Sequence, residues 1–168
     1  MEGVVIEGYG AASGRNRFTE IGGTIKAQKP FFETLGVDCR DYFNGTINVD
    51  ISPMEFVPLR SKATLVNVKW HPKLPAENFS FFDCSLTFDQ KQFGALVYLP
   101  HQETKTGFAE SFPPPTTLEF LAPRIDGLAY GAKIAISSPS GSIGFRAYQD
   151  PERKRFYSAH GPLVFLEI

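Results

Sequence analysis

The stretch SFFDCSLTFDQKQFGALVYL, residues 80–99, carries the strongest fold signal in the chain. In its first half Phe82, Cys84 and Leu86 alternate with more polar residues, the period of two that a half-buried β-strand shows. The polar letters DQKQ follow, and a second apolar run then ends at Pro100. Two strand-like runs joined by a short polar segment predict a β-hairpin.

Short strand-like runs recur on both sides of this hairpin. They are GVVIEG (3–8), RFTEI (17–21), ATLVNVKW (63–70), LEFLAP (118–123), KIAIS (133–137), SIGFRAYQ (142–149) and PLVFLEI (162–168), and we expect the last two to pair with each other. One helix of about two turns is expected at KPFFETLG (29–36), because Pro30 suits a first helical position and Gly36 suits a C-terminal stop. This pattern predicts an all-β (β-rich) fold, a β-barrel or closed sandwich with one short helix.

Bulk composition sets limits on domain count and partners. The 168 residues suffice for a single compact domain, and 16 Phe, 15 Gly and 13 Pro suit short strands joined by tight turns. A net charge of −1 argues against a dedicated nucleic-acid binder. The two cysteines, Cys39 and Cys84, are too few for a disulfide scaffold, so we expect both to be free. With no signal-peptide pattern and no long apolar run, we expect a cytoplasmic protein without membrane association.

The stretch DYFNGTINVDIS, residues 41–52, places Thr46, Asn48 and Asp50 on one face of a predicted strand. In one interpretation Asn44 and Gly45 form a type I′ hairpin turn and the polar face meets water. In the other, the neutral oxygens of Thr46 and Asn48 bind Mg²⁺. Such oxygens bind bare Mg²⁺ weakly, so the metal would have to arrive with nucleotide phosphates. The spacing alone leaves both interpretations open.

A glycine-rich segment, GYGAASG, covers residues 8–14. It superficially matches a dinucleotide fingerprint, but Ser13 occupies the place of the third glycine and no helix signal follows directly. Any phosphate contact would then use backbone N–H groups in a turn, and the alternative is a plain flexible hairpin. The three histidines, His71, His101 and His160, fall in separate predicted loops without the spacing of a metal site.

Three segments in order resemble the archaeal-type CTP-dependent riboflavin kinases. They are EGYGAASG (7–14), FFETLGVDCRDYFNGTINVDI (31–51) and LEFLAPRIDGLAYGAKIAI (118–136). That family has a small cradle-loop (RIFT-like) β-barrel with a glycine-rich first loop, a Gly-Thr-Leu-Asn motif and a late strand that ends in Ala-Pro. The resemblance therefore implies a small closed cradle-loop barrel and an enzyme that transfers phosphate from a nucleotide, here CTP, to riboflavin to give FMN.

The resemblance also implies residue roles. Thr46 and Asn48 would ligate Mg²⁺, the cofactor, together with the nucleotide phosphates. Glu119 would act as the general base. The nucleotide would be bound by the first loop, through Gly8, Tyr9, Gly10, Ala11, Ala12 and Gly14.

The chain also departs from the family pattern. Ile47 replaces the motif leucine, the family's Leu-Arg after Ala-Pro is missing from RIDG (124–127), and its Gly-Asp becomes Gly131-Ala132. Residues 53–91 are longer than the family's connection, and residues 139–168 are an addition that we expect to pack as an extra hairpin on the single domain 1–168. These departures keep an alternative open: a non-catalytic barrel that binds a nucleotide, a flavin or a protein partner.

Overall fold

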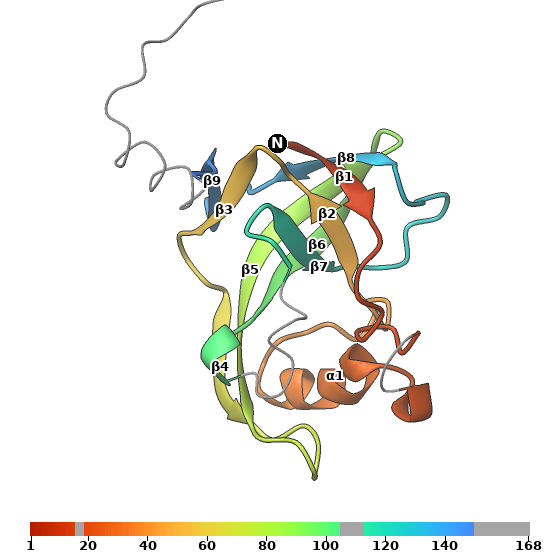
Figure 1. Cartoon of the computed structure of the whole chain (residues 1–168), viewed down its shortest axis with the longest axis vertical. Coiled ribbons are helices and arrows are strands. Elements are labelled where there is room, and N and C mark those ends of the chain that lie inside the picture. The colour runs from red at the N-terminus through yellow and green to blue at the C-terminus, as the bar shows by residue number, and fades with distance from the viewer. Residues whose placement is uncertain (16–18, 105–112, 150–168) are drawn as a thin grey trace, which may run out of the picture.

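The computed structural model describes residues 1–15, 19–104 and 113–149. The strands in these ranges are β1 (Glu2–Ile6), β2 (Ile47–Asp50), β3 (Met54–Pro58), β4 (Ala63–Val68), β5 (Glu77–Phe88), β6 (Lys91–Pro100), β7 (Thr117–Leu121), β8 (Lys133–Ser137) and β9 (Ile143–Ala147). They are joined by one α-helix, α1 (Thr24–Thr34), and by two short 3₁₀ helices, η1 (Thr19–Ile21) and η2 (Gln102–Thr104) (Figure 1). The expected β-rich class with one helix is confirmed.

The main sheet closes on itself. Its strand order is β4-β5-β6-β7-β2-β1-β8, and β8 pairs again with β5, so six antiparallel strands form a ring from which β4 extends. Among the described strands of this sheet, the six ring members have neighbours on both sides, and β4, which pairs with β5 alone, presents a free edge. Strands β3 and β9 form a separate two-stranded ribbon (Figure 1).

The hairpin predicted from residues 80–99 is the longest pairing of the ring. Strands β5 and β6 pair from Phe79 opposite Pro100 to Phe88 opposite Lys91. Asp89 and Gln90 form the two-residue turn with φ of 48° and 60°. Positive φ at both central positions is what a type I′ turn requires, and it matches the twist of the paired strands. The hairpin prediction is confirmed.

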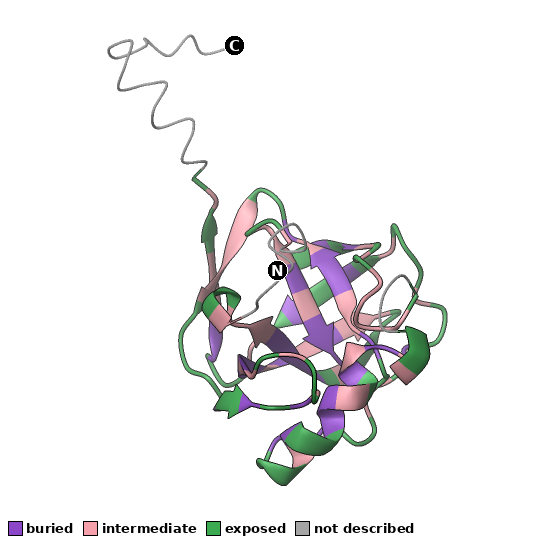
Figure 2. Cartoon of the chain, turned by 60° about the horizontal axis from the view of Figure 1, so that its bottom comes forward, coloured by how far each residue is buried: buried purple, intermediate pink, exposed green. Residues whose placement is uncertain are grey.

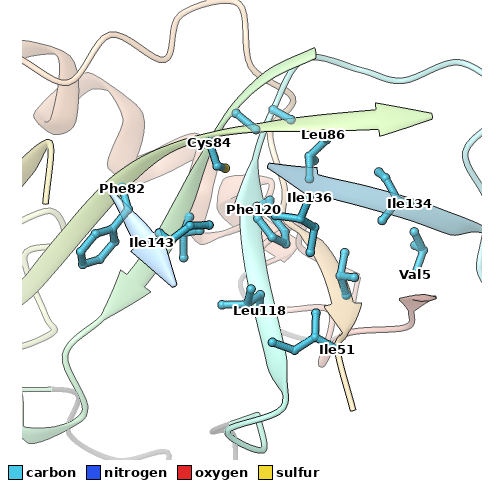
Figure 3. Close-up of a cluster of buried hydrophobic side chains, with 14 of the residues drawn as sticks. Val5, Ile51, Phe82, Cys84, Leu86, Leu118, Phe120, Ile134, Ile136 and Ile143 are labelled. Carbon is cyan, nitrogen blue, oxygen red and sulfur yellow. The ribbon is translucent and has the colours of Figure 1, made fainter. Parts of the chain in front are cut away.

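Both faces of the β5–β6–β7 segment are buried, against two different clusters. The ring cluster fills the interior and takes Phe82, Cys84 and Leu86 from β5 and Phe120 from β7 (Figure 3). The alternate positions, such as Phe81, face the other way. Two-sided burial explains the continuous apolar run of β6 from Ala95 to Leu99.

The second cluster, which we call the helix cluster, lies between the outer face of these strands and α1. Phe32 of α1 is fully buried there, with its ring edge-on to Phe79 and Phe81 at centroid distances of 5.0 Å. Edge-to-face geometry is favourable for aromatic pairs beyond the area that they bury. The remaining faces of α1 are largely exposed (Figure 2). The helix is thus fixed to the ring through one narrow stripe.

The helix starts earlier than the sequence indicated. It begins at Thr24 rather than at Lys29, and Pro30 lies inside it. The first N–H groups of the helix, those of Thr24 and Ile25, donate to the carbonyls of Ala11 and Ala12, so the glycine-rich segment caps α1. This contact between distant segments has no local signature. The strand expected at 17–21 is also wrong, because Thr19–Ile21 is η1.

The C-terminal addition contributes β9, which pairs with β3 in register from Met54 opposite Ala147 to Pro58 opposite Ile143. Its expected partner, residues 162–168, lies outside the described residues. Among the helices that the structure describes, none has the length and apolarity needed to cross a membrane.

Candidate functional site

An open pocket of about 980 Å³ lies where the glycine-rich segment, the start of β2, α1 and the β4–β5 connection meet. Its size is at the upper end of the range for small-molecule sites. Eight of the nine residues predicted for the site line it, although they come from three separate parts of the sequence. These are Gly8, Tyr9, Gly10, Ala11, Ala12, Thr46, Asn48 and Glu119.

Gly14, the ninth, does not line the pocket. It has φ of +74°, and a Cβ there would come within 2.6 Å of the Gly23 backbone nitrogen. Gly14 therefore allows the first loop to pack against the start of α1, which is a structural role.

Asn48 is the polar residue of β2 that lines the pocket. It is 9% exposed, and its Nδ2 donates to Thr46 Oγ1 over 3.3 Å, so the two side chains act as a pair. A Cβ on Gly8 would lie 2.4 Å from Asn48 Nδ2. Only glycine at position 8 lets the first loop lie across this amide.

The turn interpretation of Asn44-Gly45 is wrong. Neither residue has positive φ, and β2 pairs with β1 and β7 rather than with the chain before it. Tertiary contacts hold the preceding loop: Lys29 Nζ donates to the carbonyls of Arg40 and Tyr42 at 3.0 and 2.7 Å. A local turn preference is thereby overridden.

Gly45 does not line the pocket, since it packs between Phe43 and Ser13. Asp50 accepts from Ser52 N and Oγ at 2.9 and 2.7 Å, at the far end of β2, and is not part of the pocket.

Glu119 lies directly opposite Asn48 in the β2–β7 pairing. It is half-buried and lines the pocket. Its charge also acts on Tyr98: burial, then Glu119 and Glu77, raise the pKa of the Tyr98 hydroxyl well above its usual value. In the strand order β6-β7-β2, Glu119 of β7 lies between the strand that carries Tyr98 and the strand that carries Asn48.

The backbone of the first loop has donors to offer. The N–H groups of Gly14 and Arg15 are bonded to the carbonyls of Ala11 and Gly10 at 3.3 and 2.8 Å. Among the described residues, no backbone carbonyl accepts from the N–H groups of residues 10–13. Successive N–H groups in a turn form a concave anion site.

Arg15 and Tyr130 meet at the rim of the pocket, and neither was predicted as a site residue. Arg15 Nη1 donates to the Tyr130 hydroxyl at 2.6 Å, and its guanidinium carbon lies 5.9 Å from the centre of that ring. Among the lining residues that the structure describes, Arg15 is the one cationic side chain, against Glu7, Glu77 and Glu119.

The buried end of the pocket is a floor of four side chains that we also did not predict: Gln28 of α1, Trp70, Glu77 of β5 and Tyr98 of β6. Trp70 Nε1 donates to Glu77 Oε2 at 3.0 Å, and the Tyr98 hydroxyl donates to Gln28 Oε1 at 3.0 Å. The sequence contained one possible signal for the floor: a lone tryptophan is followed within seven residues by Pro72, Pro75 and an acidic residue. That spacing alone does not assign these residues to a binding site.

Magnesium fits the oxygens of the Thr46–Asn48 pair in kind. Hydroxyl and amide oxygens are hard ligands, and Mg²⁺ completes its octahedron with water and substrate phosphates. Throughout the described ranges, no three His, Cys, Asp or Glu side chains gather as a metal site. The pair alone offers two neutral ligands, so this site suits a metal that comes with a nucleotide.

The two cysteines and His101 lie in surroundings that indicate a structural role. Cys39 and Cys84 are free and buried, and burial is the main cause that raises their thiol pKa values to about 11 and about 12. His101 bonds Ser80 Oγ at 2.8 Å and Glu103 at 3.1 Å, away from the pocket. His160 lies outside the described residues.

No protein-family model matches the chain, and no curated protein matches it significantly.

Proposed function

We propose that this chain is a Mg²⁺-dependent phosphotransferase of the riboflavin kinase type, with CTP as donor, riboflavin as acceptor and a cradle-loop barrel as its fold. The observation that carries the proposal is the convergence of the three resembling segments. The glycine-rich segment, the Gly-Thr-Ile-Asn motif and the glutamate before Ala-Pro, which lie up to about 110 residues apart in the chain, line one pocket.

In the proposed reaction, the terminal hydroxyl of the ribityl chain attacks the γ-phosphorus of CTP. Glu119 accepts the hydroxyl proton as the new P–O bond forms, and the bond from phosphorus to the bridging oxygen breaks, so that CDP leaves. The proton then passes to solvent. The N–H groups of residues 10–13 bind phosphate oxygens and hold the donor in line with the acceptor.

The charge of the donor calls for a metal in the proposed reaction. A triphosphate carries several negative charges, and Arg15 is the one cationic side chain among the lining residues that the structure describes. Thr46 and Asn48 would hold Mg²⁺ together with the phosphates, and the metal would supply neutralisation of the charge on the transferring group.

The test is FMN formation from riboflavin and CTP with Mg²⁺, followed by chromatography. We expect Asn48→Ala and Glu119→Gln to lower the rate by roughly 100-fold or more, since each removes a group that acts at the transferring phosphate. Asn44→Ala is the matched control, because Asn44 is exposed and outside the pocket, and it should leave the rate unchanged. Absence of FMN with each of the four nucleoside triphosphates refutes the proposal.

The aromatic side chains of Trp70 and Tyr98 in the pocket lining favour a second candidate, a non-catalytic pocket that binds a neutral heterocycle such as a flavin. A ligand that binds only the folded state raises the melting temperature by mass action. Stabilisation by riboflavin, without stabilisation by any nucleotide with Mg²⁺ and without turnover, supports this candidate.

A further inference from the structure

The floor of the pocket combines burial with polarity. Gln28, Trp70, Glu77 and Tyr98 are 2%, 5%, 7% and 6% exposed, yet all four line the cavity. Buried polar side chains normally satisfy one another, and a floor built of them offers fixed hydrogen-bonding positions. Trp70 and Glu77 belong to residues 53–91, the stretch that has no counterpart in the resemblance.

Two hydrogen bonds within the floor indicate which of its groups can accept from a ligand and which can donate to one. Glu77 accepts from Trp70 Nε1, and a carboxylate has about four acceptor positions on its two oxygens, so it can accept from a ligand N–H as well. The Tyr98 hydroxyl donates to Gln28 Oε1, which leaves the Gln28 amide nitrogen as the group that donates. The floor thus offers an acceptor, Glu77, and a donor, Gln28, in the lining of one pocket with two aromatic side chains.

The position of Glu119 indicates which substrate binds at the floor of the pocket. The general base must lie at the acceptor hydroxyl. Glu119 on β7 lies opposite Asn48 of β2, and the strand on the other side of β7 is β6, which carries Tyr98. The phosphates belong with Thr46, Asn48 and the first loop, so the remainder of the acceptor extends from Glu119 toward the floor.

We propose that the floor binds the heteroaromatic ring of the acceptor, with Glu77 accepting from a ring N–H and Gln28 donating to a neighbouring ring carbonyl. Trp70 and Tyr98 supply the aromatic surface against which the ring packs. For the isoalloxazine ring these groups are N3–H and an adjacent carbonyl. The assignment of the ring as the acceptor's rests on the proposed function, whereas its hydrogen-bonding pattern follows from the floor itself.

The experiment uses the single tryptophan of the chain, Trp70, as its probe. Quenching of its fluorescence during titration gives the Kd for riboflavin and for 3-methylriboflavin, in which the N3–H donor is blocked. We expect the methylated analogue to bind roughly tenfold or more weakly, because it leaves the buried Glu77 without that partner. Equal affinity for the two ligands overturns the inference.

The variants Glu77→Gln and Glu33→Gln locate the effect. Glu33 is a carboxylate of α1 outside the pocket, so Glu33→Gln should keep the full preference for riboflavin. Glu77→Gln keeps the shape of the side chain but weakens the acceptor, and the preference should fall several-fold. An unchanged preference in Glu77→Gln, with the fold intact by circular dichroism, also contradicts the inference.

A titration in saturating CDP and Mg²⁺ separates this inference from the proposed function. We expect riboflavin to bind with nearly unchanged Kd, since the nucleotide lies on the other side of Glu119. Competitive displacement would place the nucleotide base on the floor and overturn the inference. Selective riboflavin binding without FMN formation refutes the kinase activity alone.

Discussion

The two faces of the β5–β6–β7 segment differ in what they bury. The ring cluster is made of apolar side chains and Cys84, whereas the outer face buries the helix cluster and, beside it, the hydrogen-bonded polar groups of the pocket floor. Successive residues of one strand contribute to both: Val97 faces the ring interior, and Tyr98 reaches the pocket. One set of strands therefore carries stability on one face and a binding site on the other.

The lesson is that the site is held by a rigid support. Two of the four floor residues, Glu77 and Tyr98, lie on strands β5 and β6, which each pair with strands on both sides in the main sheet. Side chains on such a frame keep their geometry better than side chains on a loop. Substitutions on the two faces should consequently separate into losses of stability and losses of binding.

The largest effect should come from Phe120→Ala, in the ring cluster. Phe120 is fully buried, and truncation of a buried phenylalanine costs about 3–5 kcal/mol of unfolding free energy. Urea unfolding measures the loss, and riboflavin affinity per folded molecule should stay unchanged. Phe31→Ala, at a position 40% exposed on α1, is the control and should cost far less. A loss below about 1 kcal/mol for Phe120→Ala would contradict the division.

Gly8→Ala should damage binding more than folding. The new Cβ would lie 2.4 Å from Asn48 Nδ2 and displace the amide from its bond to Thr46. We expect binding of CTP with Mg²⁺, measured by calorimetry, to weaken roughly 10- to 100-fold, which corresponds to about 1.4–2.7 kcal/mol. Gly94→Ala is the control, since nothing lies within 4 Å of a Cβ there. Unchanged nucleotide binding in Gly8→Ala would remove Asn48 from the site.

Tyr98→Phe tests whether the floor is a satisfied polar network. The high pKa keeps the hydroxyl protonated as a donor, and its loss leaves Gln28 Oε1 buried without that bond, at a cost of about 1–2 kcal/mol in unfolding free energy. Because removal of both partners is far less costly than removal of one, the double variant Tyr98→Phe/Gln28→Leu should recover part of the loss. Additive losses in the double variant would show that the two groups are not coupled.

Arg15→Ala should have the smallest effect on stability, within about 0.5 kcal/mol, because the side chain is exposed at the rim. Nucleotide affinity should nevertheless fall several-fold, and its dependence on salt should become weaker, since a cation near the phosphates is lost. Arg124→Ala, an exposed arginine outside the pocket, serves as the control. Equal salt dependence in the two variants would exclude a phosphate role for Arg15.

The elements whose positions depend on the local sequence pattern were predicted correctly. Alternation at Phe82, Cys84 and Leu86 identified β5 and its hairpin, because period-two burial is written directly into the sequence. The predicted start of α1 and the predicted turn at Asn44-Gly45 were wrong, because both features depend on contacts between distant segments. These contacts are the capping of Thr24 by Ala11 and the anchoring of the loop by Lys29.

The candidate site divides in the same way. The residues in recognisable motifs, such as Asn48 and Glu119, were found from the sequence and do line one pocket. The floor residues Trp70 and Glu77 were missed, because they lie outside the three resembling segments and become neighbours of Tyr98 only when β5 pairs with β6.

The most direct measurement is a crystal structure of the protein with Mg²⁺, CDP and riboflavin. The account predicts a magnesium ion about 2.1 Å from side-chain oxygens of Thr46 and Asn48. It also places phosphate oxygens against the N–H groups of residues 10–13 and the ribityl hydroxyl about 3 Å from Glu119. A nucleotide bound outside this pocket, or a metal that contacts neither Thr46 nor Asn48, would contradict it.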